Sequence, residues 1–237
     1  MKREKALKPA ANATSSRGDT EPRRRSDRGA ETRAQLIAAA LEIFGRLGYE
    51  GATTRQIAKA ADANLAAIVY HFGSKEALHL AVAEHVAKSI LARIGPTLAS
   101  ISTPEATATP EAARAALHSL VGTMVDVLLG SADAERWARF IVREQLQPTA
   151  AFDVIYGFME NAMSTALHIA TVILDTPEDD EIRLRTLTVL GQVLVFRVAQ
   201  TLVLRRMKWT AIGDTERAMI KQVILQNLDA ILEGTKP

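Results

Sequence analysis

The side chains best suited to contact a polyanion gather between residues 53 and 75, which read TTRQIAKAADANLAAIVYHFGSK. Hydrogen-bond donors stand at both ends of this stretch, and alanines fill much of the space between them. The donors are Thr53, Thr54, Arg55, Tyr70, His71 and Lys75. Hydroxyl, guanidinium and ammonium groups bind phosphate oxygens, and small side chains between them permit close approach. The stretch therefore favours a nucleic acid as binding partner.

Residue patterns typical of enzymes are missing from the sequence. It contains no Gly-x-Ser-x-Gly, no His-Glu-x-x-His and no glycine-rich phosphate loop. The five histidines are scattered, and the spacing of His79 and His85 does not place them on one metal-binding face of a helix. There is no cysteine, which excludes thiolate metal sites. We predict no catalytic site, metal or cofactor; the alternative is a helical small-molecule-binding protein or enzyme without a role on DNA.

The elements that must position these donors are predicted to be helices. Alanine and leucine dominate, and apolar residues recur at three- and four-residue steps, so an all-α fold is expected. Thr53 or Thr54 caps a short second helix, residues 61–64 form a turn, and Gly95-Pro96 is expected to break or kink the fourth helix. Nine helices are predicted, at residues 31–48, 55–61, 65–72, 75–95, 111–129, 134–146, 149–174, 179–207 and 214–233.

Two short helices joined by a tight turn, with an apolar first helix packed across both, describe a helix-turn-helix. In that motif the second helix of the pair enters the major groove of DNA. Ile68 and Phe72 are four residues apart and are expected to anchor its inner face. Ala66 and Tyr70 are then directed outward, with Ala67 and His71 beside them.

Residues 31–78 closely resemble the DNA-binding domain of TetR-family transcriptional regulators. The matching pieces, in order, are Thr53-Thr54-Arg55, Ile57-Ala58, Ala61, Tyr70-His71-Phe72 and Ser74-Lys75. The resemblance implies a nine-helix, all-α homodimer whose variable C-terminal domain binds an effector. It also implies phosphate contacts from Thr53, Thr54, Tyr70, His71 and Lys75, base reading by Arg55, and base-edge contacts from Asn64, Leu65, Ala66 and Ala67.

Two positions depart from the family pattern. Asp62 stands where the family usually has glycine, and we expect the turn to tolerate it. Val69 stands where a second tyrosine is common. This change removes one possible phosphate contact, and we predict that Val69 makes a structural contact instead.

The segment 137–160, WARFIVREQLQPTAAFDVIYGFME, resembles the effector domain of the CecR-type subgroup of these regulators. The resemblance implies a response to small toxic compounds. We predict an effector pocket in which Arg143 and Gln147 orient a polar group between apolar walls. The predicted pocket residues are Phe140, Arg143, Gln147, Phe152, Tyr156, Met159 and Met163. The alternative is that Arg136, Arg139 and Arg143, which share one side of a helix, are paired with carboxylates inside a bundle.

Charge and apolar patterning divide the chain into three parts. Residues 1–30 carry nine Lys/Arg and four Asp/Glu, a net charge of +5, which leaves −3 for the rest of a chain whose total is +2. We expect 1–30 to be a disordered basic arm, which either adds phosphate contacts or is a solvated leader. Residues 31–78 form the DNA-binding domain and 79–237 the effector-binding and dimerisation domain.

The last two predicted helices carry long apolar stripes, from Leu187 to Leu202 and from Met219 to Leu232. These stripes suit a four-helix seam between two subunits, or a core within one chain. The longest apolar stretch contains Gln192, Arg197 and Gln200, so we predict no membrane span. The expected partners are a double-stranded DNA operator, a second copy of the chain and a small-molecule effector, in the cytoplasm.

Overall fold

A computed structural model describes residues 21–130 and 132–233, and every regular element in these ranges is a helix. The all-α prediction is confirmed. The helices are α1 (Glu21–Gly51), α2 (Thr54–Ala60), α3 (Leu65–Phe72), α4 (Lys75–Ile101), a 3-10 turn η1 (Pro104–Thr107), α5 (Pro110–Leu129), α6 (Ala132–Leu146), α7 (Ala150–Leu174), α8 (Asp180–Val198), α9 (Gln200–Met207) and α10 (Asp214–Glu233).

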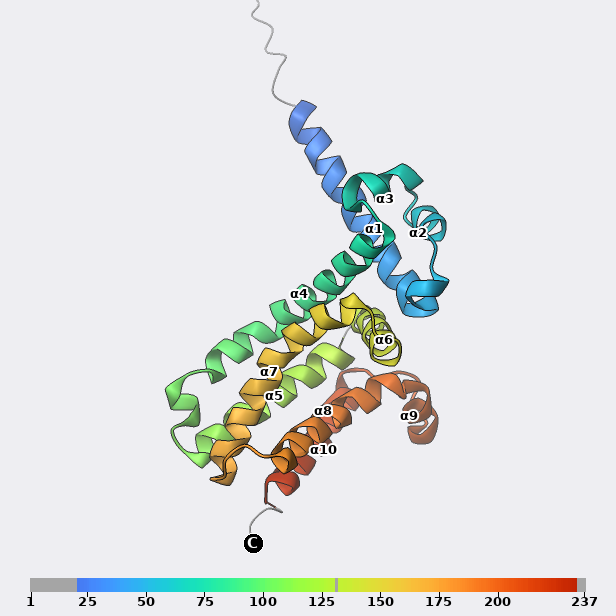
Figure 1. The fold of residues 1–237 in the computed structure, drawn as a ribbon. Coiled ribbons are helices and arrows are strands. Elements are labelled where there is room, and N and C mark those ends of the chain that lie inside the picture. Colours follow the sequence, from blue (N-terminus) through green and yellow to red (C-terminus); the bar gives the residue numbers. More distant parts are fainter. Residues whose placement is uncertain (1–20, 131, 234–237) are drawn as a thin grey trace, which may run out of the picture.

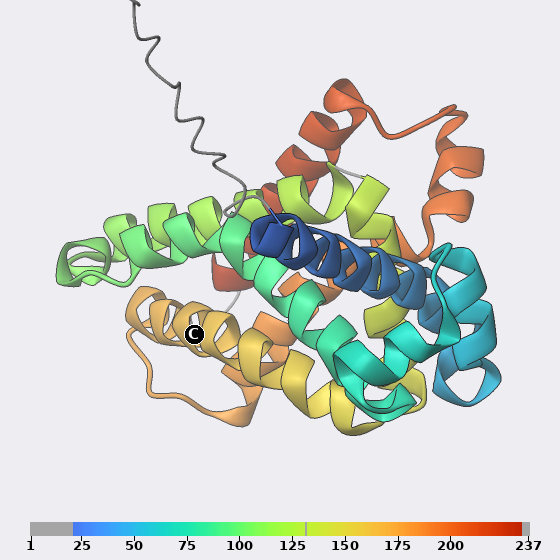
Figure 2. The same cartoon turned by 90° about the horizontal axis from the view of Figure 1, so that it is seen from above.

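Helices α1, α2 and α3 form a small head at one end of the molecule, and α4 runs from this head into the larger body (Figure 1). Viewed from above, α1 crosses over α4, and α2 lies beside the C-terminal part of α1 (Figure 2). The head core is apolar: Leu36, Phe44, Ile57 and Ile68 are almost completely buried. Burial of these side chains fixes the positions of α2 and α3 against α1.

The body is a helical bundle in which α5 occupies the centre, in contact with α4, α7, α8 and α10. Its most apolar residues pack inward, including Leu117, Leu120 and Val125. By length and composition alone α5 could cross a membrane, but 56% of its most apolar 18-residue stretch is buried inside the fold. The bent pair α8 and α9 meets the same test only if the two helices are joined as one span. The apolarity of α5 is explained by its central packing position.

Three sequence-based expectations about the helices were wrong. The first helix begins at Glu21, so the part of the expected disordered arm from 21 to 30 is helical, while residues 1–20 of that arm lie outside the described residues. Helix α4 continues through Pro96 without the break considered from the sequence, because Ile94 and Leu98 on either side are buried in the core and their packing outweighs one lost backbone hydrogen bond.

The third difference is the number of helices, since ten α-helices rather than nine lie in the described part of the chain. The helix expected at 179–207 is two helices, α8 and α9, bent by 75° at Ala199. Arg197 accompanies the bend: its Nε donates to the carbonyl oxygen of Leu128 (2.8 Å) and its Nη1 donates to the side-chain oxygen of Gln200 (2.9 Å). This bend turns α9 away from the axis of α8 (Figure 1).

Candidate DNA-binding surface and effector cavity

The start of α2 is fixed by a reciprocal cap. The backbone N–H of Gln56 donates to Thr53 Oγ1 (3.2 Å), and both the Thr53 N–H and its hydroxyl donate to Gln56 Oε1 (2.9 Å each). Such a capping box satisfies donors that the first turn of a helix leaves free. The Thr53 hydroxyl, expected to bond phosphate, therefore already has a structural partner, whereas the Arg55 side chain beside it is exposed.

The turn between α2 and α3 uses its two polar residues differently. Asp62 adopts a left-handed conformation with φ of 50°, as expected for the position where the family usually has glycine. Asn64 is extended, and its side-chain oxygen accepts from the N–H of Ala66 (2.9 Å), which caps α3. The Asn64 amide group projects from the exposed N-terminal end of α3.

Helix α3 has one buried and one exposed face. Ile68 is 1% exposed, while Val69 and Tyr70 are 64% and 84% exposed. Ala66 is also exposed, so the expected outward orientation of Ala66 and Tyr70 is confirmed. The prediction that Val69 makes a structural contact was wrong, because it follows Ile68 by one residue and is rotated out of the core.

The remaining predicted DNA contacts frame this exposed face. Leu65 is 41% exposed, and Thr54, Ala67, His71 and Lys75 are partly buried. Lys75 Nζ lies 4.3 Å from the centre of the Tyr49 ring, a cation–π contact that holds the start of α4 against the end of α1. Of the ten predicted DNA contacts, four are therefore partly buried, and the exposed ones are Thr53, Arg55, Asn64, Leu65, Ala66 and Tyr70.

A second feature is an apolar cavity of about 460 Å³ in the body. Its walls are aliphatic and methionine side chains from α4, α5, α7, α8 and α10, with a contribution from α6. This volume lies in the range of small-molecule sites. Of the predicted pocket residues, Tyr156, Met159 and Met163 line it.

The other predicted pocket residues lie elsewhere. Phe140 is 1% exposed and packs 5.2 Å from the His79 ring, and Phe152 stacks on Tyr156 without lining the cavity. Arg143 and Gln147 face α1: Arg143 Nη2 donates to the carbonyl oxygen of Arg46 (2.8 Å). Helical periodicity places residues on a face but does not say which neighbour covers it, and here α1 of the head does.

The arginines of α6 follow the pairing alternative only in part: Arg136 and Arg139 pair with carboxylates but are 41% and 39% exposed, and Arg143 bonds a backbone carbonyl instead. Arg139 Nη2 lies 3.1 Å from Glu42 Oε2 on α1, and Arg136 pairs with Asp133. Gly48, at φ of 74°, ends the regular part of α1 directly beneath Arg143, whose nearest atom lies 3.4 Å from the position a Cβ would take. Helix α6 thus ties the head to the body through polar contacts.

A buried polar cluster missed by the sequence reasoning lies at the same junction. Glu144 on α6 and His79 on α4 are 1% and 2% exposed, and Glu144 Oε1 lies 3.2 Å from His79 Nε2. The Thr149 hydroxyl and N–H, at the start of α7, donate to Glu144 Oε2 (2.7 and 3.2 Å). Burial, followed by the charge of Lys75, lowers the pKa of His79 to about 4, so its ring is neutral at pH 7.

The only sequence signal for this cluster is that His79 and Glu144 are polar residues at helix positions that face inward. His79 stands next to the buried Leu78, and its ring is enclosed by Phe44, Tyr49 and Phe140 at centroid distances of 4.4, 4.9 and 5.2 Å. No group of three or more His, Asp or Glu side chains that could hold a metal occurs in the described ranges. The cluster links three helices and has no metal-site arrangement.

Comparisons with known proteins agree with this arrangement. Residues 36–82 match the family described as bacterial regulatory proteins, tetR family, and residues 113–235 match the C-terminal domain of the HTH-type transcriptional dual regulator CecR. The chain is 36% identical over 213 residues to the CecR regulator of Shigella flexneri, an alignment that covers 87% of this chain and 94% of the relative.

Solved structures share the fold at low identity. AibR, in complex with isovaleryl coenzyme A and operator DNA, matches with a TM-score of 0.61 and 18% identity, over 84% of this chain and 97% of that one. FadR from Bacillus subtilis, in complex with stearoyl-CoA, matches with a TM-score of 0.58 and 17% identity, over 82% and 96% of the two chains. The chain belongs to the TetR family of transcriptional regulators, with a C-terminal domain of the CecR type, and is not an enzyme.

Proposed function

We propose that this regulator binds an inverted-repeat DNA operator as a homodimer, acts as a repressor, and is released by a small molecule that enters the body cavity. The observation that carries the DNA-binding part is the division of α3 into a buried anchor, Ile68, and a face that leaves Tyr70 84% exposed. A recognition helix needs this division, because one side must hold it rigidly while the other meets the groove.

Individual roles follow from position and donor type. Arg55, exposed on the first turn of α2, is assigned to reading a guanine through its paired N–H groups. Asn64, Leu65, Ala66 and Ala67, at the N-terminal end of α3, are assigned to base edges. The donors assigned to phosphate oxygens are Thr53, Thr54, Tyr70, His71 and Lys75. A phosphate contact from Thr53 would compete with its cap, because Gln56 Oε1 accepts from both its N–H and its hydroxyl.

The domain division is proposed within α4. Residues 31–78 make the DNA-binding unit and 79–237 the effector-binding and dimerisation unit, so α4 belongs to both. A continuous helix transmits displacement from one end to the other. Because residues of α4 between Val86 and Ile94 line the cavity, α4 is a direct mechanical link between effector and DNA.

Dimerisation is proposed through the outer faces of α8 and α10. The apolar stripe predicted on α10 has a buried and an exposed part. Ile220, Ile224 and Leu228 are buried within the chain, whereas Met219 and Val223 are 44% and 48% exposed. On α8 and α9 the large exposed apolar side chains are Leu184, Leu187, Val195, Val198, Leu202 and Met207. A second copy on this surface would bury these side chains and place two α3 helices about 34–36 Å apart, one turn of DNA.

The proposed mechanism is a shift between two arrangements of the heads. An effector that binds the cavity more tightly in one arrangement favours it. Displacement of α4 or α7 would reach the head through α4 itself and through the Glu144, His79 and Thr149 contacts. The favoured arrangement no longer matches the operator spacing, so DNA is released.

Selection of bound fragments from a genomic DNA pool by the purified full-length protein tests this function. We expect enrichment of an inverted repeat whose half-sites are about one helical turn apart. The Tyr70→Ala variant is the comparison. Because Tyr70 is exposed, we expect the variant to fold like the native protein and to enrich the inverted repeat less strongly. A pool without an enriched sequence, or equal enrichment by the variant, would contradict the assignment of α3.

A further inference from the structure

The cavity also carries information about the charge of its occupant. Its walls are almost entirely apolar, and four charged side chains lie among the lining residues: Glu160, Glu178, Arg183 and Arg185. An apolar cavity binds the hydrocarbon part of a ligand with little discrimination. The charged residues that are not already neutralised by neighbours therefore decide which charge the ligand carries.

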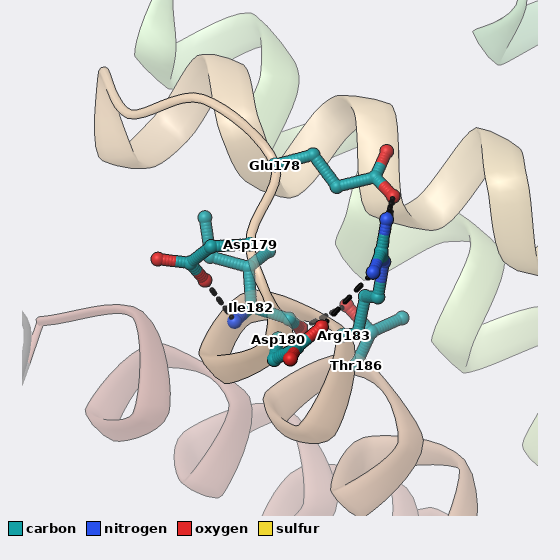
Figure 3. A network of polar contacts seen from close by, with 6 residues as sticks. All are labelled: Glu178, Asp179, Asp180, Ile182, Arg183 and Thr186. Atoms are coloured by element: carbon teal, nitrogen blue, oxygen red, sulfur yellow. Dashed lines mark hydrogen bonds and ion pairs between the residues drawn. The ribbon is translucent and has the colours of Figure 1, made fainter.

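Both arginines are already neutralised by carboxylates. Arg183 Nε donates to Glu178 Oε1 (2.7 Å) and Nη1 to Asp180 Oδ1 (3.0 Å), as Figure 3 shows. Arg185 donates from Nη2 to Glu181 Oε1 (2.6 Å) and from Nη1 to the carbonyl oxygen of Ile231 (2.7 Å). An anionic ligand would have to break these pairs, at a cost in free energy that the ligand itself must offset.

Glu160 differs from these residues. It lies on α7 among the exposed residues of the lining, and its carboxylate makes no hydrogen bond or ion pair to any residue in the described ranges. Tyr156 is one helical turn before it, 45% exposed, and its ring stacks on Phe152 with centroids 6.1 Å apart. A carboxylate one turn from an aromatic face is a combination that attracts an organic cation.

An acidic segment after α7 also reaches the cavity, because Glu178 belongs to its lining. Asp175 and the run Glu178, Asp179, Asp180 and Glu181 place five carboxylates between the end of α7 and the first turn of α8, against Arg183 and Arg185 on the following turn. Glu178 is paired with Arg183, so Glu160 is the lining carboxylate that has no ion pair in the described ranges. Methionines Met159 and Met163, which line the cavity, provide polarizable apolar contacts for the rest of such a ligand.

We infer that the effector of this regulator is a lipophilic cation, such as a quaternary ammonium or phosphonium compound, held by Glu160 and the Tyr156 ring in the lining of the apolar cavity. The inference rests on the proposed role of the cavity as the effector site. It separates this chain from AibR and FadR, whose structures hold CoA thioesters, because this lining offers no arginine without a carboxylate partner to a phosphate group.

Calorimetry on the full-length protein with two probes of matched size and shape tests the inference. Tetraphenylphosphonium carries a positive charge and tetraphenylborate a negative one. We expect tetraphenylphosphonium to bind the native protein more tightly. Glu160→Gln should weaken phosphonium binding by about three- to tenfold and leave borate binding unchanged or stronger. Glu160→Lys should reverse the order of the two probes.

Asp153→Asn is the matched control, because Asp153 is an exposed carboxylate on the same helix that does not line the cavity. It should change neither affinity. Tighter borate binding by the native protein, an unchanged phosphonium affinity in Glu160→Gln, or no binding of either probe would overturn the inference.

A parallel operator-binding assay separates this inference from the proposed function. Phosphonium that binds through Glu160 without releasing DNA would contradict the effector mechanism and leave the cation site standing. Specific operator binding together with no preference for the cation would sustain the DNA-binding role and exclude the assigned ligand class.

Discussion

The head and the body cavity are built by different means. In the head, the caps from Thr53 and Asn64 act on residues two or three positions away, and the recognition surface lies within residues 53–75. The cavity is lined by residues between Val86 and Leu232, drawn from six helices. A site assembled from local contacts tolerates changes in the rest of the chain, whereas a site assembled from distant ones depends on every helix that forms it.

The sharpest test of the head uses two adjacent residues of α3. Ile68→Ala should reduce the free energy of unfolding by about 2–5 kcal/mol, because it leaves a cavity beneath the recognition helix. Val69→Ala, at a 64% exposed position, should change it by less than about 0.5 kcal/mol. Denaturant titration followed by circular dichroism measures both. Similar losses in the two variants would show that the inner and outer faces of α3 are assigned wrongly.

The junction between head and body gives a prediction for acidic pH. Burial and then Lys75 lower the pKa of His79 from 6.5 to about 4, so the unfolded chain binds a proton at this site more readily than the folded one. Stability should therefore fall between pH 6.5 and 4, with a contribution of about 2 kcal/mol at pH 5 relative to pH 8. The groups that face the ring are Lys75, Glu144, Tyr49 and the Thr149 hydroxyl.

His79→Phe, which keeps the aromatic contacts with Phe44 and Phe140, should remove this part of the pH dependence. Unfolding free energies measured in urea at pH 8 and pH 5 give the comparison. His168→Phe is the control, because His168 is exposed. If the pH dependence is the same in the native protein and in His79→Phe, the buried histidine is not its source.

Substitution of Arg55 tests whether the proposed DNA-binding surface reads bases. Arg55→Ala should weaken binding to the selected operator by about 1–3 kcal/mol, the value of a bidentate base contact, and weaken binding to random DNA much less. Lys59→Ala, at an exposed position of the same short helix, is the charge-matched control. Fluorescence anisotropy at fixed salt measures each affinity. An equal loss of affinity for the operator and for random DNA would show that Arg55 contacts the DNA backbone and does not read a base.

The smallest expected effect concerns the local cap. Thr53→Ala should cost about 1 kcal/mol of stability, because it removes the oxygen that accepts from the Gln56 N–H, while Thr53→Ser should retain most of it. Chemical denaturation of both variants tests the cap. A comparable loss in the serine variant would assign the role of Thr53 to its methyl group instead.

The sequence by itself determined the features that depend on near neighbours. The helical class followed from composition and spacing, the turn at Asp62 followed from a residue that tolerates positive φ, and the outward face of α3 followed from Ile68. It also carried the family resemblance in residues 53–75, because the donors of the head occur in a fixed order within one short segment.

Only the tertiary structure decided which surface covers each helix. Arg143 and Phe152 lie on the same helices as residues that line the cavity. Arg143 nevertheless contacts α1, and Phe152 is not part of the cavity lining. Helix α4 continued through Pro96 because its neighbours there are buried, and the helix expected at 179–207 bends at Ala199, where Arg197 bonds to α5 and α9. Periodicity fixes the direction of a side chain relative to its own helix, whereas burial, the ion pairs of the arginines and the isolation of Glu160 depend on helices far away in the chain.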